Sequence, residues 1–174
     1  MEDSVLVGYA TRYGSTREVA EAVAAVLREQ GLVVDVRPVR DVGSVEGYRA
    51  VVLGAPFYIG SWHKDALAFA TRHAGALAGR PVALFALGPL AGDEVEGARE
   101  QLDQLVAKLA PLTPIDAALF GGKYDPSRLR LADKLLAALP ASPLHGVPAR
   151  DARDWAAIEA WARGVAPRLA AAAS

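Results

Sequence analysis

Strand-length apolar runs alternate with helix-period segments along most of the chain, and this alternation limits the fold more than any other feature. The runs are short and continuous, which is typical of parallel strands buried on both faces. The predicted strands are 5–10, 32–36, 50–54, 82–87 and 115–120. The predicted helices are 15–30, 64–77, 94–109, 127–139 and 151–172. The sequence therefore predicts an α/β fold in which helices cover both faces of a doubly wound, five-stranded parallel sheet.

With 174 residues and no internal repeat, the chain has the length of one ordinary domain, and we expect one domain over residues 1–174. A net charge of −1 does not favour nucleic acid as a partner. The chain has no cysteine, and its three histidines lack metal-ligand spacing, so we expect neither a metal site nor an iron–sulfur cluster. A start without a basic or long apolar segment predicts a cytoplasmic protein, either free or resting on the inner face of the membrane.

The turn after the first predicted strand has the composition of an anion-binding loop. Its six residues are Thr11, Arg12, Tyr13, Gly14, Ser15 and Thr16. Backbone N–H groups, hydroxyls and the dipole of the next helix would converge on one anion, with Arg12 as the nearby cation. Ser15 and Glu18 have the spacing of a capping box, so we expect Ser15 to cap this helix. We interpret the turn as a phosphate loop; the alternative is a helix cap without a ligand.

Two further loops follow strands at the same edge of the predicted sheet. The loop at 54–63 holds three aromatic side chains and a histidine, which can form a wall for a flat ring system. The loop at 88–92 is rich in glycine and lets the backbone approach the edge of such a ring. The candidate binding residues are Ala55, Pro56, Phe57, Tyr58, Ile59 and Gly60, followed by Leu87, Gly88, Pro89, Leu90, Ala91 and Gly92. The alternative for the aromatic residues is that they only close the core.

These motifs together resemble a known family. Residues 11–16 are similar to the phosphate loop of flavodoxins, and the wider pattern resembles the flavodoxin-like, menaquinone-dependent protoporphyrinogen dehydrogenases. The wider resemblance rests on Gly54-Ala55, Gly60, His63, Phe69, Phe120-Gly121-Gly122, Tyr124, Pro126 and 153–158. It implies the strand order 2-1-3-4-5, with flavin mononucleotide (FMN) between the loops after the first and third strands. It also implies electron transfer through FMN from a porphyrinogen to a quinone.

Two classes of function fit such a site. One is an FMN-dependent oxidoreductase: a protoporphyrinogen dehydrogenase, an electron-carrier flavodoxin or a quinone reductase, with a quinone or a redox protein as partner. The other is an FMN-binding sensor or partner-docking module without turnover, because no side chain is an unambiguous catalytic acid or base. The sequence has no acidic residue between Gly54 and Asp65, which argues against a low-potential carrier.

Three other features have more than one interpretation. His63 either caps or packs against a helix, or it transfers protons at the flavin. The segment 128–136 is apolar and moderately basic, and it either packs on the sheet or rests on a membrane surface to meet a quinone. One helical face is predicted to dock on the core, the alternative being a contact with a cofactor, and its members are Trp155, Ile158, Ala162, Val165 and Leu169.

Overall fold

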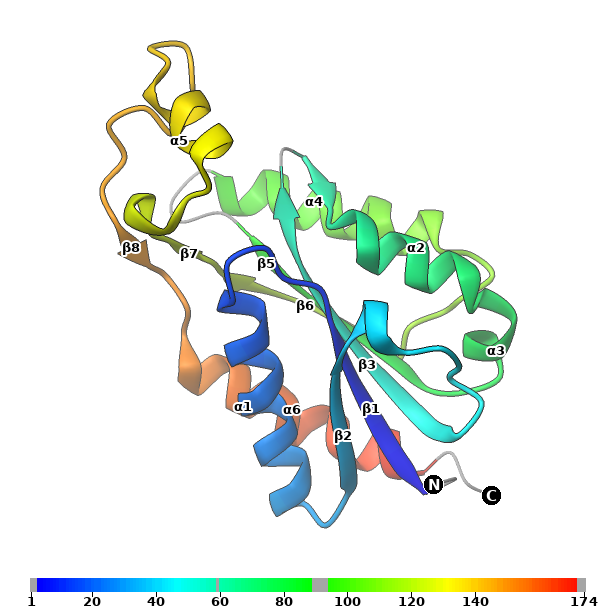
Figure 1. Ribbon diagram of the computed structural model, residues 1–174. Helices are drawn as coiled ribbons and strands as arrows, with labels where there is room; N and C mark the ends of the chain where they lie inside the picture. The colour runs from blue at the N-terminus through cyan, green and yellow to red at the C-terminus, as the bar shows by residue number, and fades with distance from the viewer. Residues whose placement is uncertain (1–2, 59, 89–93, 172–174) are drawn as a thin grey trace.

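The computed structural model describes residues 3–58, 60–88 and 94–171, and a parallel sheet forms its centre (Figure 1). The parallel strands are β1 (Ser4–Tyr9), β2 (Val33–Pro38), β3 (Tyr48–Tyr58), β5 (Val82–Gly88) and β6 (Asp116–Gly121). Their order is β2-β1-β3-β5-β6. The short strand β4 (Ser61–Trp62) only forms a hairpin with the end of β3. Because β4 lies off the main path of the sheet, this is the predicted order 2-1-3-4-5, which is confirmed.

Helices cover both faces of the sheet (Figure 1). One face carries α1 (Ser15–Glu29) and α6 (Trp155–Ala170), and the other carries α2 (Lys64–Arg72), α3 (Ala74–Ala78) and α4 (Glu94–Lys108). Each face has its own cluster of buried side chains. Within β1, Val5 and Val7 belong to the cluster under α1 and α6, whereas Leu6 belongs to the other, because successive side chains of a strand point to opposite faces. The predicted three-layer arrangement is confirmed.

Several predicted boundaries differ from the structure for local reasons. The helix predicted at 64–77 is divided at His73, which ends α2 and begins α3. The helix predicted from residue 151 starts at Trp155, because the Asp154 carboxylate accepts a hydrogen bond from the Ala157 N–H at 3.0 Å and caps it there. The third strand continues to Tyr58, since its end pairs with β4. The connection from β2 to β3 contains a short 3-10 helix, η1 (Val39–Asp41).

A cap segment, residues 123–151, lies between β6 and α6 and projects beyond the sheet (Figure 1). Its elements are β7 (Lys123–Tyr124), η2 (Pro126–Arg128), α5 (Leu131–Ala138) and β8 (Arg150–Asp151). β7 pairs antiparallel with β8, and the Ala152 N–H donates to the Gly122 carbonyl oxygen at 2.9 Å, so the segment leaves and re-enters the fold at one point. Helix α5 is shorter than the predicted helix because Leu129 and Arg130 are extended.

The leucines of α5 point away from the protein. The exposed side chains are Leu131 at 75%, Leu135 at 63% and Leu136 at 55%, and Leu139, just after the helix, is 53% exposed. Packing on the sheet, one of the two interpretations of this segment, is therefore wrong for these side chains. Within the described residues, no helix has both the length and the apolar character needed to cross a membrane.

Candidate functional site

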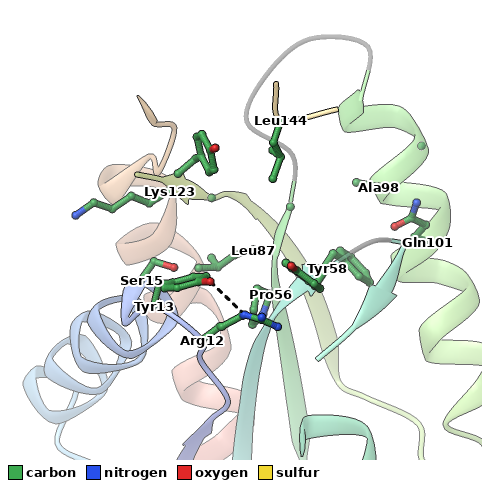
Figure 2. A pocket seen from close by; sticks show the side chains of 16 residues that line it. Arg12, Tyr13, Ser15, Pro56, Tyr58, Leu87, Ala98, Gln101, Lys123 and Leu144 are labelled. Atoms are coloured by element: carbon green, nitrogen blue, oxygen red, sulfur yellow. Dashed lines mark hydrogen bonds between the residues drawn. The ribbon is translucent and has the colours of Figure 1, made fainter. Parts of the chain in front are cut away.

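A cavity of about 550 Å³ opens at the carboxyl ends of β1, β3 and β5 (Figure 2). This volume is typical of small-molecule and cofactor sites. The cavity lies where the strand order reverses, which is where doubly wound sheets bind their ligands. It is lined by Arg12, Tyr13, Ser15, Pro56, Phe57, Tyr58, Gly60, Leu87, Gly88, Gly97, Ala98, Gln101, Gly122, Lys123, Tyr124 and Leu144.

The predicted site residues fall into four groups. Those that line this cavity together are Arg12, Tyr13, Ser15, Pro56, Phe57, Tyr58, Gly60, Leu87 and Gly88. Thr11 and Gly14 line a second, smaller cavity of about 240 Å³, and Thr16 and Ala55 are buried. Ile59, Pro89, Leu90, Ala91 and Gly92 lie outside the described residues.

Other lining residues come from elements that sequence reasoning did not assign to the site. Helix α4 contributes Gly97, Ala98 and Gln101, and the chain after β6 contributes Gly122, Lys123, Tyr124 and Leu144. Tyr124 and Gly122 belong to stretches that carry the family resemblance, so that pattern could have indicated them. Gln101 and Leu144 lie in segments whose local sequence carries no comparable pattern.

The conformation of the β1 turn depends on its glycine. Gly14 has a φ of 89°, in the left-handed region that favours glycine, and its N–H donates to Thr11 Oγ1 at 2.9 Å. The Gly14 carbonyl accepts the hydrogen bond of the Glu18 N–H, so Gly14 is the N-cap of α1. The predicted capping box is therefore wrong. Ser15 is already the first helical residue, and the Glu18 carboxylate binds Arg153 instead.

Thr16 provides a test of whether this turn suits a phosphate. Its Oγ1 atom is buried in the first turn of α1 and has no hydrogen-bond partner in the described part of the chain. A buried hydroxyl without a partner is costly. The first N–H groups of a helix likewise have no partner within the helix. An anionic phosphate oxygen would satisfy both kinds of donor, so the residues present fit a phosphate group.

The aromatic residues at the end of β3 and just after it have different surroundings. Phe57 and Tyr58 line the cavity, as expected for a wall. Trp62 is 3% exposed, and its Nε1 donates to the Ala55 carbonyl oxygen at 2.9 Å, so it closes the core. His63 caps α2, where its Nδ1 accepts a hydrogen bond from the Asp65 N–H at 3.2 Å. Burial lowers the pKa of His63, against the opposing influence of the Asp65 carboxylate.

Asp133 of α5 is an acidic residue near this cavity that sequence reasoning missed. It is 7% exposed and accepts hydrogen bonds from Arg12 Nε at 3.0 Å and from Arg12 Nη2 at 2.8 and 2.7 Å. The Tyr13 hydroxyl also donates to it, and the Tyr58 hydroxyl lies 3.4 Å away. Arg12 was expected to be the cation of the phosphate loop, but its charge already has a carboxylate partner. In the sequence, the one signal that could have indicated Asp133 is that it is a single acidic residue among the leucines of a short helix.

A second arginine, Arg153, fixes the start of α1. Its side chain is 3% exposed and donates to Asp151 at 2.9 and 2.7 Å and to Glu18 at 2.7 Å. It also donates to the Ser15 carbonyl oxygen at 3.3 Å and lies over the ring of Trp155, 4.7 Å from its centre. Trp155 is 38% exposed, so its predicted place in the core is wrong, whereas the rest of that helical face is buried as expected.

Comparisons with known proteins agree with this fold. Residues 6–146 match the family model described as Flavodoxin domain. A curated relative, the protoporphyrinogen IX dehydrogenase (quinone) of Escherichia coli K12, is 34% identical over 88 residues. That match covers 49% of this chain and 49% of the relative, so it spans about half the length of each.

Solved structures of flavodoxins match over nearly the whole chain. A Streptococcus pneumoniae TIGR4 flavodoxin is 17% identical, with a TM-score of 0.59, and the match covers 96% of this chain and 97% of that one. A flavodoxin from the domain Archaea is 14% identical, with a TM-score of 0.58, and the match covers 95% and 98% of the two chains. These likenesses show the fold. Because the family model covers most of the sequence, the chain belongs to the flavodoxin domain family, whose cofactor is FMN.

Proposed function

We propose that this protein is an FMN-dependent oxidoreductase that passes electrons from a reduced substrate to a quinone. The observation that carries the proposal is the cavity that joins the β1 turn to the aromatic side chains at the end of β3. When bound, FMN supplies the redox chemistry, and the protein supplies binding, orientation and electrostatics.

Residues in and beside the cavity suit the parts of FMN. The start of α1, with the Ser15 and Thr16 hydroxyls, would hold the phosphate, since backbone N–H groups and the helix dipole favour an anion there. Tyr13, Phe57 and Tyr58 would lie against the flavin ring and exclude water from it.

The surface of α5 supports a quinone as electron acceptor. Its exposed leucines are flanked by the exposed basic residues Arg128, Arg130 and Lys134. Apolar side chains beside basic ones are typical of segments that rest on an anionic membrane surface, where quinones reside. Leu144, from the same cap segment, lines the cavity, so the proposed membrane contact lies beside the proposed flavin site.

For the electron donor we propose a porphyrinogen. The Escherichia coli relative is named for the dehydrogenation of protoporphyrinogen IX with a quinone as acceptor. In the proposed reaction one porphyrinogen loses six electrons and six protons to become a porphyrin, and three quinone molecules each take up two electrons and two protons to become quinols.

The experiment is an anaerobic assay of the protein reconstituted with FMN. Protoporphyrinogen IX and menaquinone are supplied, and porphyrin fluorescence is followed. We expect a rise that requires protein, FMN and menaquinone. Fluorescence at the uncatalysed rate, with FMN bound, would exclude the porphyrinogen. Reduction of menaquinone by another donor would then identify a quinone reductase, whereas bound FMN that never cycles would identify a binding module.

A substitution tests the phosphate position separately. Thr16→Val keeps the shape of the side chain and removes its hydroxyl, the donor to a charged acceptor. Such a hydrogen bond contributes about 1.5–3 kcal/mol, so we expect FMN to bind about ten- to a hundredfold more weakly. Thr71→Val, at an exposed position of α2, is the matched control. Equal affinity in the Thr16 variant and in this control would place the phosphate elsewhere.

A further inference from the structure

Helix α5 is attached to the protein in an unusual way. A short amphipathic helix ordinarily buries its leucines and exposes its charges. Within α5, all of which the structure describes, Asp133 is the one buried side chain, while Leu131, Leu135 and Leu136 are exposed. The contacts of a single carboxylate, rather than an apolar face, therefore hold this helix against the rest of the molecule.

The partners of Asp133 come from two sides of the cavity. Arg12 and Tyr13 belong to the β1 turn, and Tyr58 lies at the end of β3. Figure 2 shows Tyr13 and Tyr58 on opposite sides, with Arg12 between them. The Arg12 guanidinium also lies over the Tyr58 ring, 4.9 Å from its centre. One carboxylate thus fixes three side chains that line the cavity.

The Arg12–Asp133 contact has the geometry of a strong ion pair. Arg12 uses Nε and Nη2 against both carboxylate oxygens, at 2.7–3.0 Å, and such forked pairs fix both partners in orientation. The Asp133 side chain is 8% exposed and that of Arg12 is 34% exposed, so water screens the pair only in part. Removing one partner would leave the other charge uncompensated at the wall of the cavity.

We propose that Asp133 is a positioning residue of the flavin site. It holds Arg12, Tyr13 and Tyr58 in place across the cavity, retains FMN there, and balances the positive charge of Arg12 beside the flavin. This inference rests on the proposed function, because it assumes that FMN binds in this cavity. It assigns a role at the flavin to α5, whose leucines face outward.

The test compares Asp133→Asn with Glu159→Gln. Glu159 is a matched control because it is an exposed carboxylate of α6 that pairs with Arg163 at 3.4 Å. The rate of FMN release is measured from the recovery of flavin fluorescence on dilution. We expect Asp133→Asn to release FMN about ten- to a hundredfold faster, the effect of losing one charge-assisted hydrogen bond, and Glu159→Gln to match the wild type.

The flavin midpoint potential distinguishes positioning with charge balance from a purely structural role. Without the Asp133 charge, Arg12 favours the electron-rich reduced flavin, so the potential of Asp133→Asn shifts to more positive values. The double variant Arg12→Gln/Asp133→Asn carries neither charge, and we expect it to return the potential towards that of the wild type. If Asp133→Asn does not fold, the release rate and the potential are measured on the double variant instead.

The outcomes separate the two proposals. Wild-type release rate and potential in a folded Asp133→Asn protein would overturn the role of Asp133 while leaving the FMN site intact. A double variant whose potential stays at the shifted value of Asp133→Asn would overturn the pairing with Arg12. If the wild-type protein itself failed to bind FMN, the proposed function would fall instead.

Discussion

Helices α5 and α6 are neighbours in the chain, but they are held to the molecule by opposite means. The side chains that α6 buries are Ile158, Ala162, Val165, Ala166 and Leu169, whereas α5 buries Asp133 and exposes its leucines. Apolar burial is non-directional and makes α6 part of the core. An ion pair is directional and depends on its surroundings, so the attachment of α5 depends on the orientation of Arg12 and Asp133. Helix α6 is therefore a structural part of the core, whereas α5 is held by contacts with residues of the proposed flavin site.

The largest expected effect comes from weakening the apolar contact of α6. Ile158→Ala removes a fully buried side chain, and such substitutions destabilise a protein by about 2–5 kcal/mol. Urea unfolding of the FMN-free protein measures this free energy. A loss below about 1 kcal/mol would mean that α6 is not an integral part of the core.

A smaller loss is expected where α6 begins. Arg153→Gln removes the guanidinium that joins Asp151 and Glu18, and with it the tie between the start of α6 and α1. Because both carboxylates are partly exposed, water compensates them in part, and we expect a loss of about 1–3 kcal/mol. Unfolding is again the measurement. Arg163→Gln, in the exposed pair with Glu159, is the control and should leave stability unchanged.

A pH effect extends the comparison to α2, which is capped by a neutral histidine. Burial lowers the pKa of His63, and burial lowers that of His73 as well. The unfolded chain therefore binds more protons below the ordinary pKa of 6.5, and stability falls as the pH drops from 6.5 towards the lowered values. Unfolding midpoints at pH 7.5 and 5.0 measure the loss. His63→Asn keeps a capping side chain that does not titrate, so its loss should be smaller; an equal loss would contradict this assignment.

The smallest effect on stability is expected at the leucines of α5. Leu135→Ser changes an exposed side chain, so the unfolding free energy should stay within about 0.5 kcal/mol of the wild type. Binding to vesicles of anionic phospholipid should nevertheless weaken, because the leucine is proposed to contact the membrane. Sedimentation with vesicles measures this, and Val33→Ser, at an exposed residue of β2, is the control. A stability loss comparable with that of Ile158→Ala would show that α5 packs on the core after all.

The sequence predicted the features that depend on nearby residues. The helix layers and the β1 turn follow from local periodicity and from glycine and hydroxyl patterns, whereas the strand order follows from the family resemblance. Sequence reasoning was wrong where a local pattern offers two possible N-cap residues, Gly14 and Ser15. Only the backbone conformation decides which of them caps α1. Sequence reasoning also failed for Arg12 and Asp133, which are 121 residues apart in the chain. The spacing of apolar residues along the chain gives no information about a contact between residues so far apart.

The hydrogen bond between Ala152 and Gly122 makes the cap segment an exchangeable cassette. A Cβ at the preceding residue, Gly121, would lie 2.1 Å from the Ala152 carbonyl oxygen, so the two ends of the cassette touch through their backbones. A segment of another length could be grafted between the same two ends without moving β6 or α6, because loop-closure entropy grows only slowly with length. The proposed membrane contact could thus be redesigned in this cassette, provided that Asp133, Tyr124 and Leu144 keep their places at the cavity.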